Sequence, residues 1–325
     1  MRAFLCLSVL FALSPGLRAQ SGSPGALASQ PTGSLASGYT PHRVFDTRRK
    51  RFTDFETLLG HLVSADLVFV GEQHDDPATH RMELAILEGI ARRRDSIVLA
   101  LEMFERDVQS ALDAYLAGAL TEDSLLKTAR PWKNYQGDYR PLVELARSHG
   151  WPVVASNVPR PLASLVGRSG LTALDTLPAH TRSQVAESIA CPEDDYFDRF
   201  STAMGDMSGH GPQPADPSAI SDRLTRMYQA QCVKDETMGE SVARVWRPGR
   251  LVVHYNGAFH SDFRLGTAQR ASRRAPGARM VVVTAVPVKN FDRLEPTKED
   301  RKRADYLLYV LAPPPAAVKA DSTRR

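Results

Sequence analysis

Four side chains that can bind a metal or activate water each follow an apolar run of this sequence. They are two carboxylates and two imidazoles: Glu72, His74, Glu102 and His260. The first two follow Asp66–Val70, the third follows Ile97–Leu101 and the last follows Leu251–Tyr255. A fifth polar residue, Asn157, comes after the run Pro152–Ser156. Carboxylates and imidazoles gathered in one place are what a metal, a haem or a water-activating centre requires.

The two histidines share one spacing, because each stands three residues after a glycine in a Gly-x-x-His motif. A single motif of this kind is within chance, whereas two that both follow apolar runs favour a common site. Glu102 is the strongest indication, since a carboxylate at the end of an apolar run must be solvated in a cleft or paired. Either motif histidine could instead close a turn through a ring hydrogen bond. His80, in helical register with Leu84 and Leu87, is at least as compatible with a packed core as with ligand binding.

The apolar runs indicate the framework that must position these side chains. They are continuous and not alternating, which is typical of parallel strands buried on both faces of a sheet. Two further runs, Met280–Val286 and Tyr306–Leu311, extend the sheet, and we expect the second to be an edge strand. Helical patterns separate the strands, so we predict an α/β fold with a mostly parallel central sheet flanked by helices. Residues 160–247 carry only helical patterns and predict a helical insertion between the third and fourth main strands.

This topology would bring the polar residues together. The carboxyl ends of parallel strands lie along one edge of an open sheet, and ligands bind at that edge. We therefore expect the two carboxylates, the two motif histidines and Asn157 to meet there from distant parts of the chain.

Helical spacing is present in five segments. Asp76 followed by Pro77 predicts an N-cap and a first-turn proline for the first of them. The segments are Pro77–Arg94, Asp107–Ala117, Pro141–His149, Pro178–Ala190 and Ser218–Trp246.

Composition excludes several classes of protein. The chain has 325 residues, 42% of them hydrophobic, and 41 Lys and Arg against 37 Asp and Glu. This balance is that of a globular protein, and a net charge of +4 without a basic stripe gives no reason to expect nucleic-acid binding. The sequence contains neither a Gly-x-Ser-x-Gly elbow, nor a His-Glu-x-x-His zinc helix, nor a Gly-rich phosphate loop, so the common hydrolase and nucleotide-binding motifs are absent.

The two ends of the chain differ in composition from the middle. Residues 1–19 are predicted to be a signal peptide cleaved near Ala19, because a charged start, an apolar core and small residues follow one another. We expect a flexible leader over 20–40, a single domain over 41–312 without a transmembrane segment, and a disordered tail over 313–325. An exported chain would retain Cys191 and Cys232, which could form a disulfide or stay as two buried thiols.

Six segments resemble the ChaN family, the haem-binding uptake branch of the Tiki/TraB/erythromycin-esterase-like superfamily. They run in order through most of the chain: VFVGEQHDDPATHRMELAIL (68–87), LALEMFERDVQSALDAYLAG (99–118), DYRPLVELAR (138–147), PVVASNVPRPLA (152–163), QCVKDETMGESV (231–242) and NGAFHSDFRLG (256–266). Six residues fall on the motif positions of that family: Glu72, His74, His80, Glu102, Asn157 and His260.

The resemblance implies an exported, periplasmic or envelope-associated protein that binds haem or iron, works in their acquisition and forms a homodimer. In related branches the same motifs serve metal- or water-dependent hydrolysis. The alternative is therefore a metal-dependent hydrolase, a peptidase or esterase, in which Glu72 and Glu102 are catalytic and a divalent metal is bound.

A haem pocket would need an apolar wall and a cation for the propionates. Tyr135 and Tyr139 are candidates for the wall, although aromatic residues at this spacing also suit a plain core. Arg140 could pair with a propionate or a site carboxylate, or lie on the surface. The helical region Pro178–Trp246, with Phe200, Met204, Met207 and Met227, could supply more of the wall. The tyrosine or histidine that ligates the iron is left open.

Overall fold

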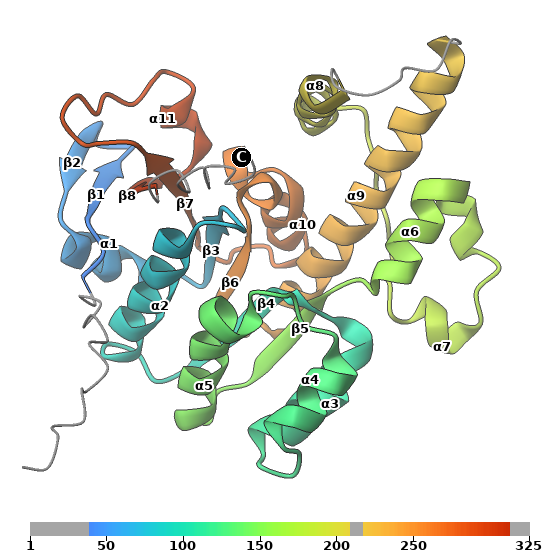
Figure 1. Ribbon diagram of the computed structural model, residues 1–325, viewed down its shortest axis with the longest axis horizontal. Helices are drawn as coiled ribbons and strands as arrows, with labels where there is room; N and C mark the ends of the chain where they lie inside the picture. The colour runs from blue at the N-terminus through green and yellow to red at the C-terminus, as the bar shows by residue number, and fades with distance from the viewer. Residues whose placement is uncertain (1–38, 209–216, 313–325) are drawn as a thin grey trace, which may run out of the picture. The chain divides into compact units, whose positions relative to one another are not determined.

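The computed structural model describes residues 39–208 and 217–312. Within this part of the chain, eight strands form one sheet in the order β2-β1-β8-β7-β3-β6-β4-β5 (Figure 1). The strands are β1 (His42–Asp46), β2 (Arg51–Thr53), β3 (Leu67–Glu72), β4 (Ile97–Glu105), β5 (Val153–Asn157), β6 (Leu251–Gly257), β7 (Met280–Val288) and β8 (Tyr306–Leu311). Only β1 pairs antiparallel with its neighbours, β2 and β8, so the sheet is mostly parallel as predicted.

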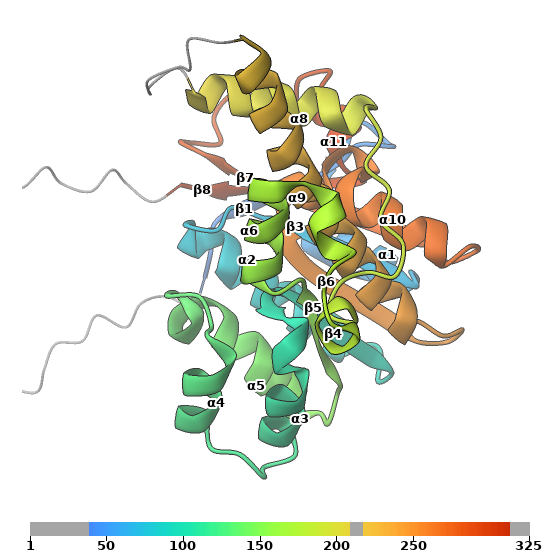
Figure 2. The same ribbon diagram turned by 90° about the vertical axis from the view of Figure 1, so that its right-hand side faces the viewer.

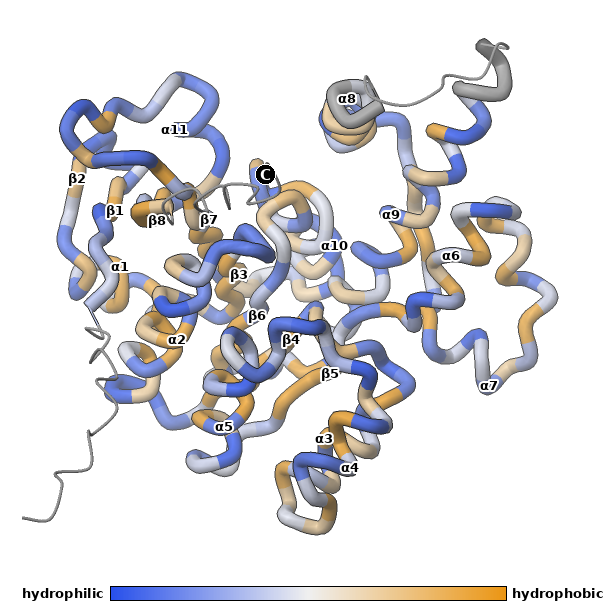
Figure 3. Tube along the Cα trace, viewed as in Figure 1, coloured by the Kyte–Doolittle hydropathy of each residue, from blue (hydrophilic) through white to orange (hydrophobic). Residues whose placement is uncertain are grey.

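The sheet is buried on both faces, which explains why its strands are continuously apolar. In β3, Val68 and Val70 pack with α1 and α2 on one face, whereas Leu67 and Phe69 pack with α9 and α10 on the other. Figure 3 shows hydrophobic colour along the strands and mostly hydrophilic colour in the loop between β7 and α11. Burial on both faces is the usual condition of a parallel sheet.

Helices flank the sheet and connect its strands. They are α1 (Phe55–Leu62), α2 (Pro77–Ala91), α3 (Gln109–Leu116), α4 (Glu122–Ala129), α5 (Arg140–Ser148), α6 (Arg160–Ser169), α7 (Ala179–Arg182), α8 (Asp195–Ser208), α9 (Pro217–Val245), α10 (Gly266–Arg274) and α11 (Asp300–Arg303). The predicted start of α2 is confirmed, because the Asp76 side chain accepts hydrogen bonds from the N–H groups of Ala78 and Thr79. Among the described helices, none combines the length and the apolar composition that crossing a membrane requires.

The predicted helical insertion is confirmed between β5 and β6. It contains α6 to α9, and Figure 2 shows α6 beside α9. The second half of α9 also packs against β5 and α10, where Val242 joins the core under the sheet. The insertion therefore packs directly on the sheet through α9, beside α10. Polar side chains of α9 can reach the edge of the sheet from there.

The prediction of Tyr306–Leu311 as an edge strand is wrong. This strand, β8, lies inside the sheet between β7 and β1. The segment His42–Asp46 forms β1 and covers the edge that β8 would otherwise expose. With only Val44 and Phe45 as apolar residues, that segment lacks the run that identified the other strands.

The prediction of one helix over Pro178–Ala190 is also wrong. Only Ala179–Arg182 is helical, and the chain then continues in turns. The Arg182 guanidinium donates hydrogen bonds to the backbone carbonyls of Val185, Ala186 and Glu187. A side chain thus satisfies carbonyl groups that a longer helix would have paired internally.

The described residues from Tyr39 onward belong to one compact unit. The predicted signal peptide, the leader up to residue 38 and the tail over 313–325 lie outside the described residues. The predictions for these segments stay predictions.

Candidate functional site

The ends of β3, β6 and β4 lie next to one another in the sheet, and this places the predicted polar residues at one edge. Glu72, the last residue of β3, is paired in register with Gly257 at the end of β6, and β4 borders β6 on its other side. Glu102 lies in β4, and His260 ends the short 3-10 turn that follows β6. The expected convergence therefore occurs.

The first carboxylate–imidazole pair is Glu72 and His74. His74 Nδ1 lies 2.5 Å from Glu72 Oε1, and the hydroxyl of Tyr139 donates to the same oxygen over 2.8 Å. The ring of Trp132 packs edge-on against the imidazole at 4.7 Å between centroids. The Nδ1 of His74 is held by the carboxylate, its Nε2 makes no hydrogen bond within the described part of the chain, and the side chain is 43% exposed.

The second pair is Glu102 and His260, and it is extended by Asp235 of α9. His260 Nδ1 lies 2.7 Å from Asp235 Oδ1, and its Nε2 lies 3.4 Å from Glu102 Oε1. The backbone N–H of Gly257 donates to the other oxygen of Glu102 over 2.7 Å. Tyr196, whose hydroxyl donates to Asp235 over 2.7 Å, fixes the second carboxylate in turn. The imidazole of His260 therefore lies between two buried carboxylates.

Both glycines of the Gly-x-x-His motifs are required by close contacts at this point. A Cβ on Gly257 would lie 2.7 Å from two ring atoms of His74, and a Cβ on Gly71 would lie 2.9 Å from Ala258 Cα. Both distances are shorter than carbon atoms tolerate. The glycines let β3 and the turn Ala258–His260 approach closely, which brings the two carboxylate–imidazole pairs together.

These contacts set the charges of the site. Burial alone would raise the pKa of Glu102, but the positive charges of His260 and His74 and the Gly257 N–H hold that pKa well below its ordinary value. Burial likewise would lower the pKa of His260, but Glu102 and Asp235 raise it to about 10. At neutral pH this pair is a carboxylate and an imidazolium.

The Glu72 and His74 pair is charged for the same reason. Burial would raise the pKa of Glu72, but the hydrogen bond from His74 and the positive charge of the nearby His80 lower it to about 2. Burial would lower the pKa of His74, yet the hydrogen bond to Glu72 and the nearby Glu102 raise it.

A cavity of about 460 Å³ opens beside these pairs. Its polar lining consists of Glu72, Gln73, His74, Gln231, His260, Asp262 and Arg303, and its apolar lining of Phe200, Ala203, Met204, Gly257, Ala258 and Phe259. A second cavity, of about 590 Å³, shares Ala203, Phe259, Asp262 and Arg303 with the first. We call the first cavity the rim pocket. It has an apolar wall, two imidazoles and one guanidinium.

The remaining predicted residues are not part of the lining of the rim pocket. The Asn157 amide donates to the backbone carbonyl of Glu102 over 3.1 Å and so joins the ends of β4 and β5. Tyr139 holds Glu72, whereas Tyr135 packs against Phe104. Arg140 pairs with Glu122, its Nε lying 2.5 Å from a carboxylate oxygen.

Sequence patterns missed four polar residues at or near the site: Glu83, Gln231, Asp235 and Arg303. Glu83 stands three residues after His80 on α2, a spacing that places both on one helix face. Gln231 and Asp235 lie in the long helix α9, within the segment 231–242 that resembles the ChaN family, but their spacing alone does not separate them from solvated helix residues. Arg303 follows β7 through a segment that carries no recognisable motif.

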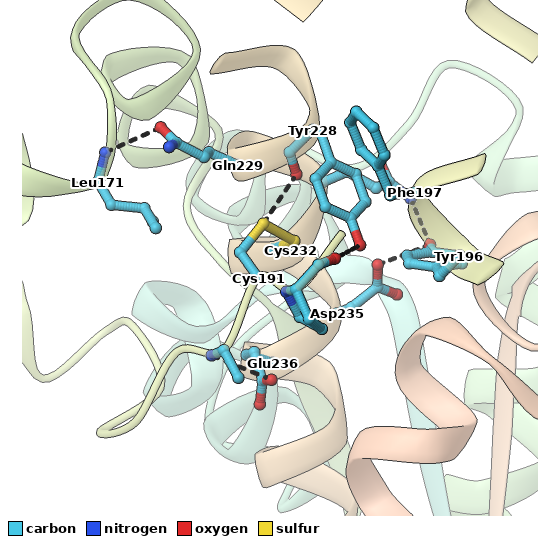
Figure 4. The surroundings of a disulfide bond; sticks show 12 residues. Leu171, Cys191, Tyr196, Phe197, Tyr228, Gln229, Cys232, Asp235 and Glu236 are labelled. Atoms are coloured by element: carbon cyan, nitrogen blue, oxygen red, sulfur yellow. Dashed lines mark hydrogen bonds between the residues drawn. A yellow bond between two sulfur atoms is a disulfide. The ribbon is translucent and has the colours of Figure 1, made fainter. Parts of the chain in front are cut away.

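The question of the two cysteines is settled by the structure. Cys191 and Cys232 form a disulfide, with 5.5 Å between their Cα atoms, that joins the segment before α8 to α9 (Figure 4). Figure 4 shows Tyr196 and Asp235 close to this bond. The disulfide therefore supports the helices that carry the partners of His260.

Comparison with known families gives a match over most of the described chain. The family model described as haem-binding uptake, Tiki superfamily, ChaN, matches residues 58–271. The chain belongs to the ChaN family. None of the curated proteins matches this chain in sequence.

The fold agrees with membership in the ChaN family. A structure of ChaN of Campylobacter jejuni with cofacially bound haem has a TM-score of 0.61 and 17% identity, covering 82% of this chain and 96% of that one. A protein from Bacillus cereus follows with a TM-score of 0.44, 11% identity and coverages of 80% and 92%. The erythromycin esterase EreC in an open conformation has a TM-score of 0.45, 11% identity and coverages of 84% and 83%. The similarity to the Campylobacter protein shows that the two chains share a fold.

Proposed function

We propose that this member of the ChaN family binds haem in the rim pocket and works in haem or iron acquisition. The observation that carries the proposal is the placement of His74, whose Nδ1 is held by Glu72 and which lines a pocket with an aromatic and methionine wall. An imidazole fixed in this way by a carboxylate is the usual support for a metal-bound histidine. Among the described residues, no hydrogen bond joins a partner to Nε2 of His74, so this atom is available to iron.

The rest of the rim pocket fits the proposed ligand. Phe200, Met204 and Phe259 supply apolar surface for a flat macrocycle, and His260 offers a second imidazole. When bound, haem supplies an iron that accepts a nitrogen ligand. The protein's part is to present the imidazole, exclude water with the apolar wall and neutralise the propionates.

Titration with haemin, followed by absorbance in the Soret region, tests the proposal. We expect a saturable shifted band at about one haem per chain. His74→Ala should lower the affinity by more than about 100-fold, because even loss of a residue that only supports a metal ligand costs about 10–100-fold. His260→Ala should weaken binding to a smaller extent. Binding should also tighten as pH rises through the raised pKa of His74, since iron must displace its proton.

The control for surface binding is His180→Ala, because His180 is exposed and lies on α7, outside the rim pocket. This variant should bind haem like the wild type. Unchanged affinity in both His74→Ala and His260→Ala would contradict the proposed ligation.

Arg303 is the cation that we assign to the propionates. It lines both cavities, its Nε is buried without a hydrogen-bond partner among the described residues, and it lies 3.4 Å from Asp262 Oδ2. Arg303→Ala should weaken haem binding about tenfold, the size of a charge-assisted hydrogen bond at a partly exposed site. The loss should shrink in high salt. Arg301→Ala, on the same short helix but exposed, is the matched control, and an equal loss in both variants would argue against the assignment.

Export and dimer formation belong to the same proposal. The composition of residues 1–19 supports export to the periplasm or envelope, and membership in the ChaN family supports a homodimer. In such a compartment the disulfide would persist.

A hydrolase is the second candidate, and the arrangement of His260 favours it. Its imidazole is held by Asp235 at Nδ1 and lies beside Glu102 at Nε2, next to a cavity that could admit a substrate. A histidine oriented by a carboxylate next to a second carboxylate can transfer protons in hydrolysis. A divalent metal could assist at the same edge of the sheet.

A further inference from the structure

Glu72 also belongs to a second polar group, which it forms with His80 and Glu83 of α2. All three side chains are buried, with exposed fractions of 1%, 3% and 1%. Each offers one atom that could ligate a metal, and these atoms lie within 4.8 Å of one another. The lining of the rim pocket includes Glu72 but, within the described part of the chain, neither of the two helix residues.

The hydrogen bonds around this group leave its inner atoms unsatisfied. Oε1 of Glu72 has two hydrogen-bond partners, His74 and Tyr139, whereas its buried Oε2, which faces Nδ1 of His80 at 3.3 Å, makes no hydrogen bond among the described residues. The same holds for Oε1 of Glu83. A buried carboxylate oxygen without a partner costs free energy, so something must complete this group.

The imidazole of His80 is oriented toward the same two carboxylates. Its Nε2 lies 3.0 Å from the backbone carbonyl of His74, which is the outer hydrogen bond that metal-bound histidines commonly make. Its Nδ1 then lies 2.9 Å from Oε2 of Glu83 and 3.3 Å from Oε2 of Glu72. Separations of about 3 Å are those between neighbouring ligand atoms around an ion with bonds of about 2.0–2.2 Å.

We propose that Glu72, His80 and Glu83 form a buried site for one divalent transition-metal ion, separate from the haem pocket. One imidazole and two carboxylates suit ions such as Zn²⁺ or Mn²⁺ better than Ca²⁺, which takes six to eight oxygen ligands. A charge of +2 balances the two carboxylates beside a neutral imidazole. The site shares Glu72 with the rim pocket, whereas its other two ligands, His80 and Glu83, come from α2 and do not line that pocket.

One proton shared by the two carboxyl groups, beside a charged His80, is the rival arrangement. It would satisfy the same oxygens without any ion, since a protonated carboxyl can donate to its neighbour. The two arrangements differ in metal content: the proposed site holds one ion per chain, whereas the shared proton requires none.

The test is a calorimetric titration of the chelator-treated chain with ZnCl₂ and, separately, MnCl₂. We expect one high-affinity ion per chain and a loss of at least about 100-fold in Glu83→Gln, more than the 10–100-fold that loss of a supporting residue costs. Glu88→Gln is the matched control, because Glu88 is exposed on the same helix. Equal affinity in the two variants would overturn the proposal.

X-ray absorption of the zinc-loaded wild type keeps the test decisive if Glu83→Gln does not fold. The proposed site predicts one imidazole and otherwise oxygen ligands. Two imidazoles would place the ion with His74 and His260 at the rim pocket and overturn the proposal. Absence of a stoichiometric ion would overturn it in favour of the shared proton.

Discussion

Replacement of Glu102 by glutamine is expected to lower any hydrolytic rate of this protein by about 10²–10⁴, the usual size of an acid–base contribution. The carboxylate lies 3.4 Å from His260 Nε2 and keeps the imidazole protonated together with Asp235. The glutamine oxygen can still accept from the Gly257 N–H, so its NH₂ group faces His260. His260 would then lose the carboxylate at Nε2, and its pKa would fall.

Two measurements separate this effect from unfolding. The rate on ester and peptide substrates is compared with the imidazole titration of His260, followed by NMR, in both proteins. Glu105→Gln is the matched control, because Glu105 lies on the same strand but pairs with the half-exposed Arg130. It should leave both the rate and the His260 titration unchanged. A fully active Glu102→Gln protein, with a lowered His260 pKa, would exclude a role for this carboxylate in hydrolysis.

The same substitution should also reveal the pH range in which the pair stabilises the fold. The lowered pKa of Glu102 contributes stability that is present above its ordinary value of 4.5 and is lost as pH falls below it. The raised pKa of His260 contributes stability that is present below 6.5 and is lost as pH rises toward about 10. The stability difference between wild type and Glu102→Gln, about 3 kcal/mol for a broken buried pair, should therefore be largest between these two ordinary values.

The residues at the sheet edge were predictable because apolar runs indicate the strands, and polar residues of catalytic or metal-binding type follow those runs. Continuous apolar runs identified β3, β4 and β6 without knowledge of tertiary contacts, and the residues after each run identified Glu72, Glu102 and His260. The parallel arrangement then required those residues to meet. The glycines of both motifs were visible in the sequence, although the contacts that require them were not.

The partners of these residues were not predictable, because each comes from an element whose position the sequence does not specify. Asp235 reaches His260 from α9, 25 residues away in the chain, and the family resemblance of its segment does not say which of the polar residues there faces the site. Arg140 was a candidate cation by its place among aromatic residues, yet it pairs with Glu122. Arg303, which lines both cavities, follows a segment without a motif. Such roles depend on packing between helices and loops, which local patterns do not encode.

Removal of the disulfide is expected to lower the free energy of unfolding by about 4 kcal/mol. The bond joins Cys191 and Cys232, which are 41 residues apart in the chain. A cross-link over a loop of that length lowers the entropy of the unfolded chain, which stabilises the fold by about 4 kcal/mol. The double variant Cys191→Ala/Cys232→Ala should therefore unfold at a lower denaturant concentration than the wild type. The slope of its transition should rise if the unfolded chain expands.

The disulfide should also support the ligand site, because the loop that it closes contains α8. The first turn of that helix contains Tyr196, which holds Asp235, and the next turn contains Phe200, which lies in the wall of the rim pocket. These aromatic residues form a small cluster with Tyr228 and Cys232, so the bond secures one of the smaller cores and not the main sheet. Loss of the bond should loosen α8 before the sheet unfolds, and it should weaken haem binding along with stability.

Reductant provides the matched comparison for this last prediction. It should lower the unfolding midpoint and the haem affinity of the wild type, and it should change neither in the double variant, which has no bond to break. Hydrogen exchange should increase in α8 and the first half of α9, while β3, β4 and β6 stay protected. A wild type whose stability and haem affinity are the same with and without reductant would mean that packing of Tyr196, Phe200 and Tyr228 alone holds α8 in place.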